Sequence, residues 1–166
     1  MTTGSSVHGS AVLVGDHAVL IRGPSGSGKS RLAFDLILAG RAGQIPTAML
    51  IGDDRVHLEA AQGRLVVRPA RELAGLIEIR GLGIRRCDFA EQAIVGLVVD
   101  LSAADAERLP PPDALLVSIY GVILPRIPVS SNFQPLPLVV AALSTRPSDD
   151  CSKGIGNHIS PTIATQ

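Results

Sequence analysis

The segment Gly23–Ser30 constrains this chain most, because it satisfies the phosphate-binding-loop pattern G-x-x-x-x-G-K-[S/T] in full. Glycines let such a loop curl until its N–H groups point at phosphate oxygens, and the following helix adds its positive N-terminal end. Lys29 supplies a charge for the β- and γ-phosphates, and the Ser30 hydroxyl can bind Mg²⁺. We therefore predict that the chain binds a nucleoside triphosphate. The predicted binding residues are Gly23, Pro24, Ser25, Gly26, Ser27, Gly28, Lys29 and Ser30.

The sequence on either side of this loop fits a strand before it and a helix after it. The apolar runs Ala11–Val14 and Ala18–Ile21, separated by Gly15-Asp16-His17, predict a β-hairpin with a three-residue turn. After the loop, Leu32, Ala33, Leu36 and Ile37 form one apolar stripe, which predicts a helix through Leu38. Gly40 is the predicted stop signal of that helix.

Further along the chain, short apolar runs alternate with turn residues. They predict strands at 48–51, 77–80 and 94–101, a hairpin from 56–59 and 64–68, one or two strands within 114–124, and a short helix at 136–143. The early hairpin breaks the regular βαβ alternation of an all-parallel sheet, so we predict an α/β fold with a mixed sheet. We expect a single domain over residues 1–143 and a polar, poorly ordered tail over 144–166.

Composition excludes several classes of function. The formal net charge is zero and only 2% of residues are aromatic, which argues against a general nucleic-acid binder. No apolar run approaches the roughly 20 residues that span a bilayer, and the first residues lack the layout of a signal peptide. Cys87 and Cys151 have no metal-site spacing and are expected to be free thiols. We expect a soluble cytoplasmic protein that binds neither membrane nor nucleic acid.

Asp53 and Asp54 end the predicted strand at 48–51, where a phosphate-binding fold needs a carboxylate near its metal. Neighbouring positions at a strand end point in different directions, so one carboxylate can face Mg²⁺ while the other acts as a general base. A solvated turn is the alternative. Glu78 and Arg80 share one face of a predicted strand, and they are either site residues or a surface pair. His8 is either solvated or functional.

Four segments together resemble the HPr kinase/phosphorylase family, whose members phosphorylate a serine on HPr, a small phosphocarrier protein of the sugar phosphotransferase system. They are Val7-His8-Gly9, the loop 23–30, Asp53-Asp54-Arg55-Val56 and Ile77-Glu78-Ile79-Arg80-Gly81-Leu82-Gly83-Ile84. The last octet is close to the family's own signature and is far more specific than the phosphate-binding loop. The resemblance extends from about Val7 to Leu143.

The resemblance implies a role for each matching residue. ATP and Mg²⁺ would be used, with Lys29 on the phosphates, Ser30 and Glu78 on the metal, and Asp53 supporting the metal. On the acceptor side, four residues would be catalytic in addition to Lys29: Asp54 as proton acceptor, His8 beside it, Arg80 as an assisting group, and Arg108 at the position of an active-site arginine.

The resemblance further implies a mixed-sheet P-loop kinase domain like that of phosphoenolpyruvate carboxykinase, assembled as a hexamer, with an HPr-like phosphocarrier as its protein partner. The usual form carries an additional N-terminal domain, so the chain is expected to be a short, proteobacterial-type form. The loop Arg41–Thr47 is longer than usual. At Pro128-Val129-Ser130-Ser131-Asn132 the family's basic residue and Gly-Arg are missing. Since those residues are tied to dephosphorylation, the expectation covers the kinase reaction and not the phosphorylase reaction.

Two other functions stay open from the residues alone. A kinase for small molecules or nucleotides would use an arginine-rich lid, which the six arginines between Arg64 and Arg86 could provide. A catalytically inert nucleotide sensor would act by binding another protein. A GTPase is excluded because the chain has no Asn-Lys-x-Asp guanine-specificity motif.

Overall fold

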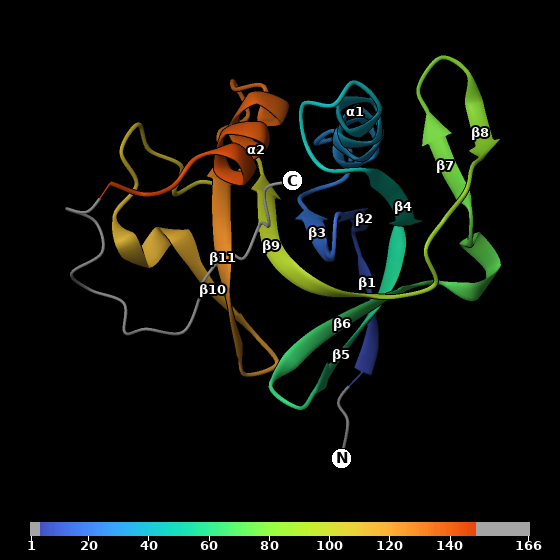
Figure 1. Cartoon of the computed structure of the whole chain (residues 1–166), viewed down its shortest axis with the longest axis horizontal. Coiled ribbons are helices and arrows are strands. Elements are labelled where there is room, and N and C mark those ends of the chain that lie inside the picture. Colours follow the sequence, from blue (N-terminus) through green and yellow to red (C-terminus); the bar gives the residue numbers. More distant parts are fainter. Residues whose placement is uncertain (1–3, 149–166) are drawn as a thin grey trace.

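In the computed structural model, which describes residues 4–148, two helices lie over one large, strongly bent sheet (Figure 1). The strands are β1 Gly4–His8, β2 Ser10–Val14, β3 His17–Arg22, β4 Ala48–Gly52, β5 Arg55–Ala61, β6 Arg64–Pro69, β7 Leu76–Ile79, β8 Gly83–Arg86, β9 Ala93–Leu101, β10 Leu116–Ile119 and β11 Val122–Val129. The helices are α1 Lys29–Arg41 and α2 Pro135–Ser144, with short 3-10 turns at Arg71–Leu73 and Pro112–Leu115.

The large sheet is mixed, as predicted. Its strand order is β1-β5-β6-β9-β3-β2-β4, and β11 also pairs with β9 and with β10, while β7 and β8 form a separate hairpin. Strands β3 and β11 both run parallel to β9, and β2 is antiparallel to both β3 and β4. The carboxyl ends of β3, β4, β9 and β11 therefore meet at one edge of the sheet. In open α/β sheets this is the edge where ligands bind.

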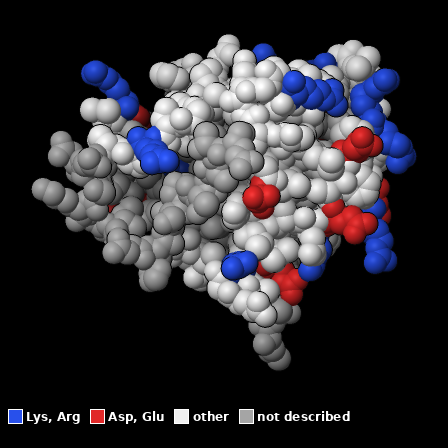
Figure 2. Space-filling view, viewed as in Figure 1, with Lys and Arg blue, Asp and Glu red and all other residues white. Residues whose placement is uncertain are grey.

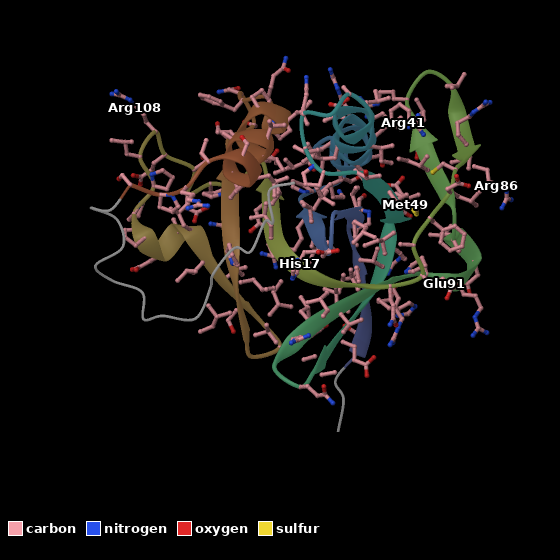
Figure 3. All side chains as sticks on the ribbon, viewed as in Figure 1. His17, Arg41, Met49, Arg86, Glu91 and Arg108 are labelled. Carbon is pink, nitrogen blue, oxygen red and sulfur yellow. The ribbon has the colours of Figure 1, made fainter. Side chains whose placement is uncertain are left out.

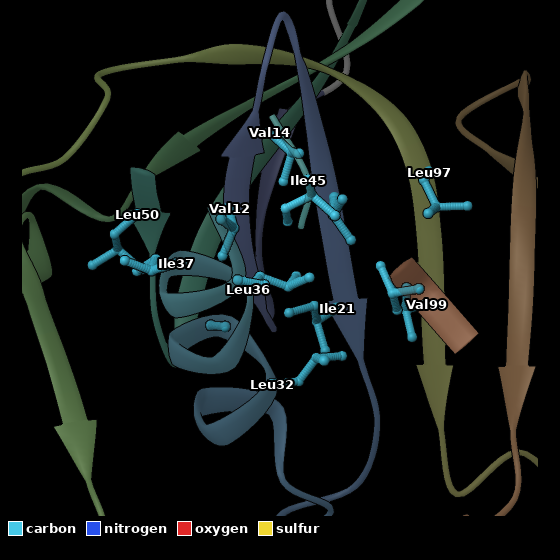
Figure 4. Close-up of a cluster of buried hydrophobic side chains, with 14 of the residues drawn as sticks. Val12, Val14, Ile21, Leu32, Leu36, Ile37, Ile45, Leu50, Leu97 and Val99 are labelled. Atoms are coloured by element: carbon cyan, nitrogen blue, oxygen red, sulfur yellow. The ribbon is translucent and has the colours of Figure 1, made fainter. Parts of the chain in front are cut away.

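The central strands are apolar throughout because both of their faces are buried. On β3, Val19 and Ile21 pack toward the helices, whereas Ala18 and Leu20 face the second layer formed by β5, β6 and β10–β11. Figure 4 shows the first of these two cores, in which Leu32 and Leu36 of α1 lie against the sheet. A strand covered on both faces forms a continuous apolar run instead of an alternating one.

Gly40 lies inside α1, so its predicted role as the stop of the helix was wrong. The helix continues to Arg41, and the residue with positive φ that follows it is Gly43. A Cβ atom on Gly40 would lie 2.7 Å from the backbone N of Ala48 and 2.9 Å from its Cβ. Gly40 is therefore needed for the close approach of α1 to β4, which outweighs the helix propensity that an alanine would add.

Other predicted elements differ at their ends. The first hairpin has the two-residue turn Gly15-Asp16, because His17 already pairs with Val14. Arg80 does not lie on a strand, since β7 ends at Ile79 and Arg80 begins the turn into β8. The predicted single strand at 77–80 is thus one half of a hairpin. Strand β1 was also not predicted, because a Gly/Ser-rich segment gives no strand signal and pairs with β5 only in the folded chain.

The hairpin β5–β6 and helix α2 lie where the sequence predicted them. The strand pair β10–β11 begins within the predicted range 114–124, but β11 continues to Val129 because it pairs with β9 along Arg126–Val129. Most of the predicted tail, together with Cys151, falls on residues 149–166, outside the described residues. Cys87 is a free, half-buried thiol, and burial followed by the charge of Asp88 raises its pKa. Neither helix in the described part of the chain has the length and apolarity to cross a membrane.

A charged network joins the three parallel strands near their carboxyl ends. Asp100 of β9 accepts hydrogen bonds from Arg22 Nε at 2.7 Å and Nη2 at 2.8 Å on one side, and from Arg126 Nε on the other. Burial alone would raise the pKa of Asp100, but the hydrogen bonds and charges of Arg22 and Arg126 outweigh burial and hold it below the ordinary value of 3.8. The network therefore stabilises the fold above that pH, and its contribution is lost as the pH falls below it.

Replacing Asp100 with Asn is expected to lower the free energy of unfolding at pH 7 by on the order of 3 kcal/mol, because two half-buried guanidinium groups lose their counter-charge. The variant should also lose part of the wild type's dependence on pH below 4. Urea denaturation at pH 7 and at pH 3.5 measures both effects. Asp35→Asn is the control, since Asp35 forms a long ion pair, at 3.9 Å, with the exposed side chain of Arg31. A variant whose stability depends on pH as steeply as the wild type's contradicts the assignment.

Candidate active site

The phosphate-binding loop lies between β3 and α1, at the edge where the parallel strands end. Gly26 and Gly28 have φ values of +79° and +97°, and apart from each glycine and its chain neighbours no heavy atom of residues 4–148 lies within 4 Å of where a Cβ would stand. At Gly23 a Cβ would meet Leu101 Cβ at 3.0 Å and Ser27 Oγ at 2.6 Å. Glycines thus allow the loop to pack on the end of β9 and leave its outer face open. Ser27 Oγ is buried and has no hydrogen-bond partner in the described part of the chain, which is compatible with a polar ligand completing the loop.

Lys29 is buried at the start of α1 and lies over its own loop. Its Nζ donates hydrogen bonds to the carbonyl oxygens of Gly23 at 2.9 Å and Pro24 at 3.0 Å. Burial lowers the pKa of Lys29, and the charges of Asp54 and Asp53 oppose that shift. An ammonium group held only by two neutral carbonyls can exchange them for phosphate oxygens with a gain in Coulomb energy.

Asp53 is buried at the end of β4 and accepts hydrogen bonds from three segments. The donors are Ser10 Oγ at 2.6 Å, Ser30 Oγ at 2.8 and 2.9 Å to the two carboxylate oxygens, and the Glu78 backbone N–H at 3.1 Å. A loop Ser/Thr and a strand-end Asp are the pair that holds Mg²⁺ in P-loop enzymes.

Sequence reasoning missed Ser10. Its side chain is fully buried on β2, 43 positions from Asp53 in the chain. A single serine at a strand start carries no signal of its own. Only a strand order that places β2 between β3 and β4 shows that its hydroxyl faces the carboxylate.

Asp54 points away from Asp53 because its backbone is left-handed, with φ +67°. Asp tolerates this conformation better than most residues, and the conformation is common at functional sites. The Gly9 N–H donates to the Asp54 carbonyl at 3.0 Å, and Asp54 Oδ1 lies 3.0 Å from His8 Nε2. The Asp54 side chain is 65% exposed, so one carboxylate of the pair is buried and its neighbour faces solvent beside His8.

The hairpin β7–β8 carries the rest of the signature octet. Ile77 anchors it in the core next to α1, and the Glu78 N–H joins it to Asp53. The Glu78 side chain is exposed at this junction. Arg80 is exposed in the turn, and within residues 4–148 it forms no hydrogen bond or ion pair with the other predicted site residues. In the same part of the chain no three His, Cys, Asp or Glu side chains form a metal-binding group, so a metal here would need ligands from the nucleotide and water.

The other arginines that the sequence singled out are spread over several elements and do not form one cluster around the phosphate-binding loop. Arg108 is exposed on the β9–β10 connection, and Figure 3 shows its side chain directed outward at the rim of the molecule. The six arginines between Arg64 and Arg86 do not form one lid: Arg68 on β6 pairs with Glu59 at 2.8 Å, whereas Arg85 and Arg86 lie on β8. Figure 2 shows basic and acidic side chains interspersed on the side of the hairpin β7–β8.

Comparisons with known proteins assign the chain to a family. The family model described as HPr Serine kinase C-terminal domain matches residues 1–110. An HPr kinase/phosphorylase of Enterococcus faecalis is 39% identical, over 86% of this chain and 48% of that protein. One of Mycoplasma genitalium is 31% identical, over 85% of this chain and 48% of that protein. The chain thus spans about half the length of these relatives.

The structure gives the same result as the sequence comparison. It matches the structure of the Hpr(Ser) kinase/phosphatase from Coxiella burnetii with a TM-score of 0.65 and 26% identity, over 84% of this chain and 93% of that one. This likeness confirms the mixed α/β kinase fold that the resemblance implied. Family model, relatives and fold agree, and the chain belongs to the HPr kinase/phosphorylase family.

Proposed function

We propose that this chain transfers the γ-phosphoryl group of ATP to a serine hydroxyl of an HPr-like phosphocarrier protein. The observation that carries the proposal is the different placement of two adjacent carboxylates. Asp53 is buried against the phosphate-binding loop, whereas Asp54 is exposed beside His8. One carboxylate is positioned for a metal–nucleotide complex and the other for a protein that approaches from solvent. The names of the relatives, HPr kinase/phosphorylase, support the choice of acceptor.

Mg²⁺ would be held by Ser30 and Asp53, with Glu78 beside them, and when bound it neutralises charge on the β- and γ-phosphates. The residues present fit this ion, because Mg²⁺ keeps several waters and needs only one or two carboxylates from the protein. Ser10 and the Glu78 N–H fix the Asp53 carboxylate independently of Ser30. Ser30 is then free to turn its hydroxyl oxygen toward the ion while Asp53 stays in place.

In the proposed reaction the serine oxygen of the acceptor forms a bond to the γ-phosphorus as the bond to the leaving ADP oxygen breaks. The serine proton passes to the Asp54 carboxylate, which His8 orients through the contact at 3.0 Å. Lys29 stabilises the charge that develops on the transferred group, and Arg80 and Arg108 are proposed to assist. Positioning and electrostatics supply most of the acceleration in reactions of this type.

We propose the forward kinase reaction and not the phosphorylase reaction. Strand β11 ends at Val129, so Ser130, Ser131 and Asn132 follow at the sheet edge that carries the phosphate-binding loop. These short side chains offer no cation to bind inorganic phosphate. A hexameric assembly and a cytoplasmic location stay predictions of the sequence.

Ser10→Ala should weaken Mg²⁺-dependent nucleotide binding about tenfold, because Asp53 loses a buried charge-assisted hydrogen bond worth about 1–3 kcal/mol. Titrating Mg²⁺ against a fluorescent ATP analogue measures the loss. Ser118→Ala, an exposed serine on β10, is the control. A folded Ser10→Ala protein with wild-type Mg²⁺ dependence would show that Ser10 does not hold Asp53 for the metal.

Asp54→Asn should leave ATP binding within twofold of the wild type and lower turnover at least a hundredfold, because the acceptor serine loses its base. The test incubates the chain with Mg²⁺, radiolabelled ATP and a panel of phosphocarrier proteins, and measures phosphoserine. Lys29→Ala is the comparison and should lose nucleotide binding itself. Normal turnover by Asp54→Asn contradicts the role of Asp54, and nucleotide binding without phosphorylation of any carrier would instead favour a sensor.

A further inference from the structure

The connection from β9 to β10, residues 102–115, carries Arg108 and is held at both of its ends by one side chain. Arg126 of β11 donates two parallel hydrogen bonds to Asp105, from Nη1 at 2.8 Å and Nη2 at 2.9 Å. Its Nη1 also donates to the carbonyl oxygen of Ala114 at 2.8 Å. The side chain of Arg126 is only 13% exposed, whereas the Asp105 carboxylate that it holds faces solvent.

The same guanidinium joins this connection to the phosphate-binding loop. Arg126 Nε donates to Asp100, which also receives the two hydrogen bonds of Arg22. Arg22 directly precedes Gly23, and Leu101, the neighbour of Asp100, packs within about 3 Å of the position that a Cβ on Gly23 would take. A continuous series of charge-assisted hydrogen bonds therefore runs from Asp105 to Arg22, the residue that directly precedes the loop.

We propose that Asp105 and Arg126 are positioning residues that hold the Arg108 segment at a fixed place relative to the bound triphosphate. Only Ala106 and Glu107 lie between Asp105 and Arg108, so three Cα-to-Cα steps limit the distance between their Cα atoms to about 11 Å. Figure 3 shows the Arg108 side chain directed outward, so what the two anchors fix is the stretch of backbone from which this side chain extends.

If Asp105 had a purely structural role, its loss would lower the stability of the fold. Asp105 is 52% exposed, and an ion pair to such a residue contributes little to the stability of the fold. Its loss should therefore free the segment without unfolding the sheet. Asp100 is mostly buried between two arginines, so replacing it would change the stability of the fold as well as the anchoring of the segment.

The test is Asp105→Asn in the full chain, with Glu107→Gln as the matched control because Glu107 is an exposed acid on the same segment and forms no ion pair among the described residues. We expect a roughly tenfold lower kcat for phosphorylation of the acceptor, an ATP dissociation constant within twofold of the wild type, and faster amide hydrogen exchange confined to residues 102–115. Unchanged exchange in this segment, or an unchanged kcat, overturns the proposal.

A double mutant decides whether Asp105 acts through Arg108. Asp105→Asn should cost nothing further in an Arg108→Ala background, because the group that it positions is already absent. Additive losses overturn the proposal, as does full activity of Arg108→Ala. The positioning role rests on the proposed function, but the two fail differently: a wild-type chain that binds ATP and phosphorylates no acceptor overturns the function, whereas the exchange measurement tests the anchoring without any turnover.

Discussion

The hydrogen bonds of the buried Asp53 carboxylate hold the site together, because they join four separate segments at one point. Ser10 comes from β2, Ser30 from the first turn of α1, Glu78 from the hairpin β7–β8, and Asp53 itself from the end of β4. A buried carboxylate without partners would be costly, so each of these hydrogen bonds favours the assembly of the four segments around Asp53. The same interactions that order the sheet edge therefore also form the proposed metal site.

The features that could be predicted from the sequence are those whose residues are contiguous in the chain. The phosphate-binding loop, the apolar run of β3 and the Asp53-Asp54 pair are contiguous, and the structure has them where they were expected. The opposite directions of the two carboxylates were also expected, although the cause is the left-handed backbone of Asp54 rather than strand alternation alone. Gly40 shows the limit of local reasoning: in sequence it looks like a helix stop, and only the approach of Ala48 explains it.

The parts that sequence reasoning missed depend on contacts between distant residues. Ser10, β1 and the network of Arg22, Asp100 and Arg126 all rely on which strands become neighbours. Arg126 was one of many arginines, and nothing near it in the chain indicates a carboxylate 26 positions away. The family resemblance identified residues that share a motif, but it gave no information on the residues that hold the motif in place.

The two networks act on opposite ends of the phosphate-binding loop. At its start, Arg22 and Leu101 tie Gly23 to β9, and at its end Ser30 is tied to β4 through Asp53. Gly26 lies between these anchors, and a Cβ atom on it would meet no described residue within 4 Å other than its chain neighbours. A loop fixed at both ends and open in the middle loses little conformational entropy when a triphosphate binds, since most of the ordering is complete before the ligand arrives. In the proposed function, the charged network at the sheet edge thus contributes to nucleotide binding without touching the nucleotide.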